Sequence, residues 1–437
     1  MKKLSLGLGL FLGALVAACS VSNDEATAGE NDELNENKAL GMTDVTILYP
    51  MPDKWELVDD MLGPPAEDAK GELLPASIFA EIANLEAPPM IQPDGSVLDQ
   101  DKKLFEKWAD SFAYLRVVGI RLDPCFGETT NLGAPQCLST IRLTAQFFLP
   151  RHLQTSSTNP TLDPGASIHL FYKLSQSDFA TLAKEMLELR KSTGLPLQKA
   201  LISPQQDGVH PTLKAEGLRG AYANALKAII LKYAGEQTLS RIAFCVQDRV
   251  TNTGGYYQNP QQSPDTRWVF GGFDYRNSRL QPLPIGSLGN YTGLQSVDTF
   301  PRQRGDKNLV TVDPAITVPD NILGAFNPVK QPNGSFAFTD AEKGKTAARR
   351  LQNPSNWTSA NSDCVSCHMA KIALIDRNAF QPHELDFKSY TFRLDNTQPV
   401  LGPFKHFGWD QGRPIISART VNETAVVLEY LNKNVLR

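Results

Sequence analysis

Cysteine and histidine are scarce in this sequence, which contains only six of each among 437 residues. A large excess of charge is also absent, because 43 basic and 47 acidic side chains give a net charge of −4, so we expect no nucleic-acid partner. Beyond the amino terminus, no apolar run approaches the length of a membrane span. The segment from Asp44 to about Asp320 contains no Gly-rich phosphate loop, no G-x-S-x-G motif and no H-E-x-x-H motif. These absences leave most of the chain without a recognisable catalytic chemistry.

The amino terminus carries the one long apolar run. Two lysines precede a largely apolar stretch over residues 4–18, which is too short to remain across a bilayer as a mature helix. The stretch ends in the letters VAAC, which resemble a bacterial lipobox. The resemblance implies a signal peptide over 1–18 and lipid attachment at Cys19, whereas an ordinary secretory signal is the alternative. In such lipoproteins an Asp after the cysteine favours retention in the inner membrane. Here Ser20 follows the cysteine, so we expect a lipid anchor in the outer membrane, with the protein facing the periplasm or the cell surface.

Composition divides the rest of the chain into four segments. Residues 19–43 are acidic and nearly free of large apolar side chains, which predicts a flexible tether. More than 400 residues follow the signal peptide, too many for one ordinary core, so more than one domain is expected. We place an α+β domain of unknown function at 44–276, a Pro/Gly-rich, loop-like connecting region at 277–335, and a second domain at 336–437.

The apolar patterns predict the elements of the α+β domain. Period-two alternation with β-branched and aromatic residues indicates strands, and apolar residues three and four apart indicate helices. Strands are expected over 44–50, 111–125, 137–150, 166–174, 238–248 and 266–275, and helices over 77–85, 175–194 and 217–235.

Three of the cysteines lie in this domain. Cys125 and Cys137 are at the two ends of a turn-rich loop between predicted strands. Because an exported protein meets an oxidising compartment, we expect them to form a disulfide, which would contribute about 3 kcal/mol in the chain-entropy model. Two free thiols are the alternative. Cys245 lies on an alternating strand pattern and is expected to be a small buried apolar residue.

The remaining two cysteines form the most specific motif of the chain. Cys364, Cys367 and His368 stand in the pattern C-x-x-C-H. In this pattern two thiols add across the vinyl groups of a haem, and the adjacent histidine becomes the proximal ligand of the iron. The expected cofactor is therefore one covalently bound haem c. A zinc site, a thioredoxin-like redox pair and a plain local disulfide are the alternatives.

The last hundred residues resemble a class I c-type cytochrome domain. Thr339–Gln352 looks like the first helix of that family, and Arg419–Asn434 looks like the last helix, which in the family packs across the first. The resemblance covers about a quarter of the chain. It implies a fold in which an α+β body of mixed strands and helices is followed by a small all-α cytochrome c-like domain.

The sequence departs from that family at the second iron ligand. A class I domain supplies a methionine well downstream of the motif. The only methionine after His368 is Met369, directly beside the proximal histidine on the same side of the haem. His406, in a loop before the final helix, is the first candidate for the distal ligand, and His383 is the second. An upstream residue such as Met90 or His210, or an open iron, remains as an alternative.

The function expected from these features is electron transfer by a lipid-anchored, single-haem cytochrome. Its partners would be redox proteins of the cell envelope, and the membrane would be contacted through the lipid. Arg413 and Arg419 are candidates for pairing with the haem propionates. An enzyme or sensor with an open haem iron is one alternative. The other is an envelope binding or structural lipoprotein with an accessory haem.

Overall fold

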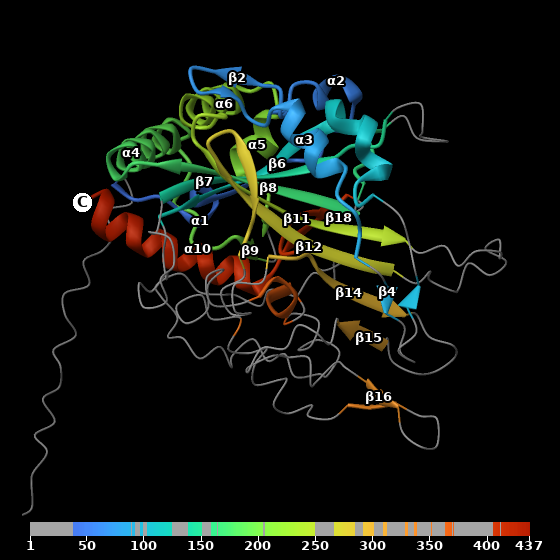
Figure 1. The fold of residues 1–437 in the computed structure, drawn as a ribbon. Coiled ribbons are helices and arrows are strands. Elements are labelled where there is room, and N and C mark those ends of the chain that lie inside the picture. The colour runs from blue at the N-terminus through green and yellow to red at the C-terminus, as the bar shows by residue number, and fades with distance from the viewer. Residues whose placement is uncertain are drawn as a thin grey trace, which may run out of the picture. The chain divides into compact units, whose positions relative to one another are not determined.

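One antiparallel sheet organises the molecule (Figure 1). In the described part of the chain it has nine strands in the order β1-β6-β7-β8-β11-β12-β14-β15, with β13 also paired to β12. These strands are β1 (Thr46–Leu48), β6 (Leu115–Asp123), β7 (Ser139–Phe147), β8 (Ala166–Leu174), β11 (Leu239–Arg249), β12 (Thr266–Arg276), β13 (Arg279–Pro282), β14 (Gln295–Phe300) and β15 (Leu309–Val312). Because side chains alternate between the faces of a strand and the strands are in register, each face of the sheet continues from strand to strand.

The structure is a computed structural model that describes part of the chain. The described residues are 38–88, 90–91, 97–98, 103–124, 139–150, 159–163, 165–203, 206–249, 266–284, 292–300, 309–312, 328–330, 336–338, 351, 363–368, 370, 405–410 and 412–437. All of them belong to one unit that spans Glu36–Arg437.

The remaining elements are helices and short strands that precede, connect or follow the strands of the sheet. The helices are α1 (Met42–Val45), α2 (Trp55–Val58), α3 (Ala76–Ala83), the 3₁₀ helix η2 (Glu106–Tyr114), α4 (Gln176–Ser192), α5 (Pro211–Glu216), α6 (Ala221–Tyr233), α10 (Ala418–Tyr430) and the π-helical turn η6 (Leu431–Val435). The short strands are β2 (Glu67–Asp68), β3 (Gly71–Glu72), β4 (Met90–Ile91), β5 (Val97–Leu98), β9 (Ile202–Ser203), β10 (Gln206–Asp207), β16 (Pro328–Lys330), β17 (Phe336–Phe338), β18 (Phe407–Asp410) and β19 (Arg413–Ile416). Ser175 and Ser417 cap α4 and α10 through their hydroxyl oxygens. Within the described ranges, no helix combines the length and the apolar character that crossing a membrane needs.

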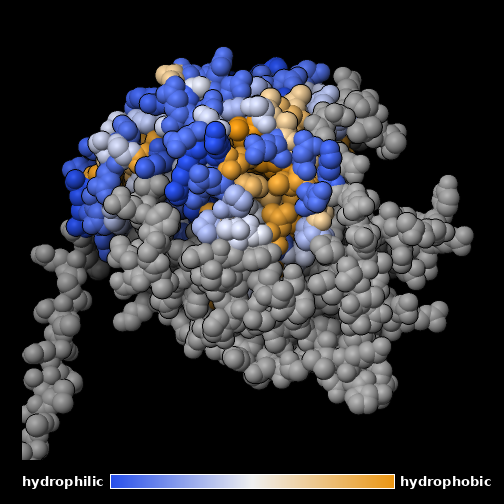
Figure 2. Space-filling model, viewed as in Figure 1, coloured by the Kyte–Doolittle hydropathy of each residue, from blue (hydrophilic) through white to orange (hydrophobic). Residues whose placement is uncertain are grey.

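The first face of the sheet is apolar and lies beneath α3, α4 and α6 (Figure 1). Leu170 and Phe244 on this face are buried. The ring of Phe105 lies 5.4 Å from that of Phe244, and the Tyr172 hydroxyl donates to the Leu73 carbonyl at 2.8 Å. The outer surfaces of α4 and α6 are mostly hydrophilic (Figure 2). This face therefore forms the main apolar core of the unit.

The second face of the sheet is more polar, and the carboxyl-terminal segments cover it. Its backbone register places these residues on the same face: Arg121, Arg142, Thr144, Gln146, Ser167, His169, Cys245, Phe270 and Gln295. The Gln146 side chain makes two hydrogen bonds with the Trp409 backbone, at 2.8 and 2.9 Å. Gly119 is required beneath the ring of Phe407, because a side chain at position 119 would collide with that ring. The carboxyl-terminal segments are thus docked on the α+β body.

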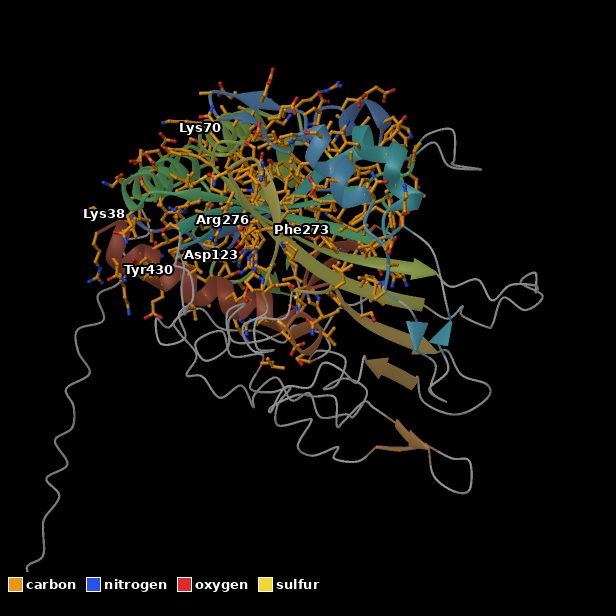
Figure 3. All side chains as sticks on the ribbon, in the orientation of Figure 1. Lys38, Lys70, Asp123, Phe273, Arg276 and Tyr430 are labelled. Atoms are coloured by element: carbon orange, nitrogen blue, oxygen red, sulfur yellow. The ribbon has the colours of Figure 1, made fainter. Side chains whose placement is uncertain are left out.

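The two ends of the described chain also meet. The Asn432 side chain accepts from the Leu40 backbone N–H at 2.9 Å and donates to its carbonyl at 3.1 Å. Lys38 and Tyr430 lie at the same end of the molecule (Figure 3). Because residues such as Leu40 are fully buried, the flexible tether predicted for 19–43 does not extend over its last residues. The short apolar run at the end of that segment is part of the core.

The α+β character of the body is confirmed, and the predicted helices 175–194 and 217–235 are α4 and α6. The region 277–335 was expected to be loop-like, but its described residues include the strands β13, β14, β15 and β16. The described residues of 336–437 form β17, the β18–β19 hairpin, a helical turn at the C-x-x-C-H motif, and α10. The all-α cytochrome-like domain stays a prediction, since most of that segment lies outside the described residues.

Candidate functional site

The C-x-x-C-H motif forms the start of a helix that is anchored on the sheet. We refer to residues 364–368 as the motif helix. The Asp363 carbonyl accepts from the Cys367 N–H at 3.2 Å. Gln295, at the start of β14, donates to the Asp363 carboxylate at 3.1 Å and accepts from the Cys364 N–H at 2.9 Å. The Asp363 carboxylate also accepts from the Ser366 N–H at 2.8 Å and so caps the motif helix. One amide side chain of the sheet therefore holds both this cap and the first N–H of the helix.

Replacing Gln295 by leucine should lower the free energy of unfolding by about 2–4 kcal/mol, because the Cys364 N–H and the Asp363 carboxylate would lose their buried partner. Urea unfolding measures the change. The matched control is Gln281→Leu on β13, where the glutamine is exposed and a change within about 0.5 kcal/mol is expected. Equal effects of the two substitutions would show that Gln295 does not anchor the motif helix.

The structure brings His406 against the motif. The rings of His368 and His406 have their centroids 4.5 Å apart, and Phe270 of β12 lies 4.6 Å from His368 on the sheet side. The Nε2 atom of His406 is 3.9 Å from the Cys367 sulfur. Two thiols and two imidazoles, one of them from a distant part of the chain, thus gather at the second face of the sheet.

The first turn of α10 holds His406 in place. Its Nδ1 atom shares a 2.8 Å hydrogen bond with the Ser417 hydroxyl. Its carbonyl accepts from the Ser417 N–H and from the Thr420 hydroxyl, both at 2.9 Å. With Nδ1 as the donor to Ser417, the lone pair of the ring is on Nε2, which faces the motif helix. Metal-binding histidines commonly have this arrangement, in which the second nitrogen is fixed by a hydrogen bond.

Both thiols of the motif are in an environment that disfavours the thiolate. Burial, together with the nearby Asp363 carboxylate, raises the pKa of Cys364 to about 12. Burial also raises the pKa of Cys367 to about 11, although the positive charge of Arg419 opposes the change. Reactive redox cysteines have pKa values shifted in the opposite direction. Cys245 is buried in β11, as the sequence predicted, and burial raises its pKa as well.

Two residues near the site were not identified from the sequence. His169 of β8 shares a 3.1 Å hydrogen bond with Thr144, and burial, aided by positive charge including that of His368, lowers its pKa to about 3. Lys405, directly before His406, is 2% exposed, and its ammonium group has no hydrogen-bond partner among the described residues. Burial lowers the pKa of Lys405 to about 8. An isolated histidine on a strand and a lysine in a loop gave no sequence signal for this site.

The two arginines proposed for propionate pairing lie in different surroundings. Arg419 is buried on α10, where it donates to Glu423 at 2.7 Å and to the Leu351 carbonyl at 2.6 Å. Arg413 is exposed at the turn of the β18–β19 hairpin, at the opposite end from His406. His210, named above as an alternative ligand, belongs to a separate cluster with Asp44.

Several predicted site residues lie outside the described residues. They are Cys19, Cys125, Cys137, Met369 and His383. The lipid anchor, the disulfide and the second candidate for the distal ligand therefore stay predictions.

The described ranges contain no group of three or more His, Cys, Asp or Glu side chains arranged to hold a metal ion directly. Comparisons of the chain with protein families, with curated proteins and with solved structures found no match.

Proposed function

We propose that the chain is a monohaem c-type cytochrome that transfers electrons, with haem bonded to Cys364 and Cys367. His368 and His406 would be its two axial ligands. The observation that supports this proposal is the position of His406, whose ring lies 4.5 Å from that of His368 although the two belong to different segments. A haem carried by the motif helix would take a second ligand from another part of the chain, and His406 lies beside the motif with its second nitrogen held by a hydrogen bond.

The side chains at the site suit this group. The two thiols lie on one turn of the motif helix, which is what attachment to the two vinyl groups of one haem requires. Phe270 offers an apolar wall. The buried ammonium group of Lys405 has no described hydrogen-bond partner and suits an anionic propionate. The rings of His368 and His406 are in contact, so they would have to move apart for both to hold the iron of one haem.

When bound, haem supplies reversible one-electron exchange at its iron. The side chains that bind the iron then determine whether another molecule can also bind there. If His368 and His406 both hold the iron, no position at the metal would be left for a substrate or a gas. This favours electron transfer over the alternative of an open-site haem enzyme or sensor. The hydrogen bonds of Gln295 to Asp363 and Cys364 hold the motif helix on the sheet and would keep His368 in place.

The cellular setting is part of the same proposal. Lipid attachment at Cys19 would keep the protein in the outer membrane, where redox proteins of the envelope are its partners. The expected Cys125–Cys137 disulfide would form in the same oxidising compartment as haem attachment.

The test is haem-dependent peroxidase staining of the protein on a denaturing gel after expression in a host that matures c-type cytochromes. Wild type should stain, and the double variant Cys364→Ser/Cys367→Ser should not, because only thioether bonds keep haem on an unfolded chain. Cys245→Ala is the matched control and should stain like wild type, since Cys245 lies in β11 outside the motif. Absence of staining in the wild type, with protein accumulated in the envelope, would rule out the proposed function.

A further inference from the structure

The β18–β19 hairpin, which begins directly after His406, is held on the second face of the sheet. The ring of Phe407, the first residue of the hairpin, packs against Gly119 of β6, and Phe407 is 2% exposed. Two residues further on, the backbone of Trp409 is hydrogen-bonded to the Gln146 side chain of β7. The chain next to His406 is therefore fixed by contacts with two strands of the α+β body.

Gln146 pairs with the hairpin as a strand backbone would. Its side-chain amide donates to the Trp409 carbonyl at 2.9 Å, and its side-chain carbonyl accepts from the Trp409 N–H at 2.8 Å. Gln146 is 0% exposed, so water cannot replace Trp409 as the partner of these atoms. Neighbouring residues of a strand direct their backbone groups to opposite edges, so a shift of the hairpin by one residue would leave Gln146 without its partners.

The residue before Trp409 is a glycine, and the close approach of Gln146 requires it. Gly408 has a φ of +131°, which other residues rarely adopt, and a Cβ atom at this position would lie 2.6 Å from Gln146 Oε1. A shift of the hairpin by one residue would place Phe407 or Trp409 here, and neither side chain could be accommodated. Gln146 and Gly408 together therefore allow one alignment of β18 on the sheet.

The alignment of β18 determines where the imidazole of His406 lies. A shift by one residue would move His406 by about 3.3 Å and turn its side chain to the opposite face of the hairpin. In the observed alignment, its ring lies 4.5 Å from the ring of His368. A functional site needs its groups held within about 0.5 Å of the required geometry. A shift by one residue would thus remove His406 from the motif.

We infer that Gln146 is a positioning residue for the second axial ligand of the iron. It acts through the backbone of β18, which holds His406 beside the motif helix. This inference rests on the proposed function, in which His368 and His406 bind the iron. It gives the α+β body, in which the sequence shows no recognisable catalytic motif, a role at the haem site. The body sets the coordination of the iron, and the carboxyl-terminal segment carries the haem.

Replacing Gln146 by methionine tests this role in the full-length holoprotein. Gln146→Met keeps the length of the side chain and removes both hydrogen bonds to Trp409. The reduced wild-type protein should not bind carbon monoxide, whereas the variant should bind it to at least about half the extent of His406→Ala, because the imidazole is no longer held at the iron. Absorption spectra with and without carbon monoxide measure the difference, and haem staining on a denaturing gel shows that the haem is still attached.

Two further variants separate positioning from stability. Gly408→Ala displaces Gln146 from the hairpin in a different way and should also bind carbon monoxide, so it decides the question if Gln146→Met does not fold. Tyr172→Phe is the matched control, because it removes a buried hydrogen bond, to the Leu73 carbonyl, on the first face of the sheet. It should lower the urea midpoint of unfolding as Gln146→Met does, without any binding of carbon monoxide.

Carbon monoxide binding in Gln146→Met and Gly408→Ala, but not in Tyr172→Phe, would support the inference. No binding in either of the first two variants, while His406→Ala binds carbon monoxide, would overturn it and leave His406 as the ligand. Binding in Tyr172→Phe to the same extent would also overturn it, since reduced stability would then be the cause. If His406→Ala does not bind carbon monoxide either, the proposed ligand is wrong, and if the wild type does not stain for haem, the proposed function itself fails.

Discussion

Replacing Glu423 by glutamine is expected to lower the free energy of unfolding by about 3 kcal/mol at pH 7, and by much less near pH 3. The Glu423 carboxylate joins α10 to the second face of the sheet. It lies 2.7 Å from Arg121 of β6 and 3.7 Å from Arg142 of β7, and it accepts from Arg419 of its own helix at 2.7 Å. Burial alone would raise the pKa of Glu423, but Arg121 and Arg419 outweigh it and lower the pKa from 4.5 to about 2.

The sign of the pH dependence follows from that lowered pKa. In the unfolded chain Glu423 takes up a proton near its ordinary pKa of 4.5, whereas in the folded protein it stays charged until about pH 2. Its contribution is therefore complete above about pH 5 and is lost as the pH falls towards 2. Glutamine cannot titrate, so the difference between wild type and Glu423→Gln isolates this one carboxylate. Urea unfolding of both proteins between pH 3 and pH 7 measures it.

The arginines explain why the effect is large. Arg121 and Arg419 have side chains only 7% and 6% exposed, so removal of the carboxylate leaves buried positive charges without their anion. Truncation in Glu423→Ala should therefore cost about 3–5 kcal/mol. Glu429→Gln is the matched control, since among the described residues Glu429 pairs with the half-exposed Lys433 near the end of α10, and an effect below about 0.5 kcal/mol is expected. A pH-independent difference for Glu423→Gln would show that the charge of Glu423 is not what stabilises the docking.

Local patterns in the sequence were sufficient to predict many of the helices and strands of the α+β body. The helix predicted over 175–194 is α4, with Ser175 as its cap, because the capping serine and the spacing of apolar residues act within the helix itself. The strand predicted over 238–248 is β11, and Cys245 is buried in it. In both cases the physical cause lies within a few residues of the element.

The region 277–335 shows the limit of that approach. Its Pro, Gly, Asn and Gln content indicated loops, yet Gln295–Phe300 is a strand of the sheet. Hydrogen bonding to β12 over five successive residue pairs orders this segment. The conformation of this segment is decided by its pairing with another strand, and the composition of the segment itself does not contain that information.

The second face of the sheet could not be recognised from the sequence either. Arginine, threonine and glutamine alternating with apolar residues, as in β6 and β7, are typical of strands with one face in water. Here Arg121 and Gln146 are buried instead, because α10 and the β18–β19 hairpin bring partners for them from more than 250 residues away. The nearness of His406 to the motif depends on the same docking, since Ser417 and Thr420 at the start of α10 hold His406. Stability and the candidate haem site are therefore linked through one helix.

The largest spectroscopic effect is expected from His406→Ala. If His406 is the second axial ligand, the reduced wild-type protein should not bind carbon monoxide, and the alanine variant should bind it, because the imidazole that fills the position is gone. The measurement is the change in the reduced absorption spectrum on addition of carbon monoxide. Haem staining on a denaturing gel should stay at the wild-type level in the variant, since Cys364 and Cys367, to which the haem would be bonded, are unchanged.

Two other histidines provide the comparison for this result. His169→Ala removes an imidazole from the same face of the sheet, where the Nδ1 atom of His169 is hydrogen-bonded to Thr144. His383→Ala removes the second candidate for the ligand that the sequence indicated. Neither should bind carbon monoxide if His406 is the ligand. Ser417→Ala should act in the same direction as His406→Ala but more weakly, because it keeps the imidazole and removes only the hydrogen bond that orients it. The opposite result would be carbon monoxide binding in the His383 or His169 variant and an unchanged spectrum in His406→Ala. It would assign the ligand to that other histidine, and the contact between His406 and the motif would then be packing alone.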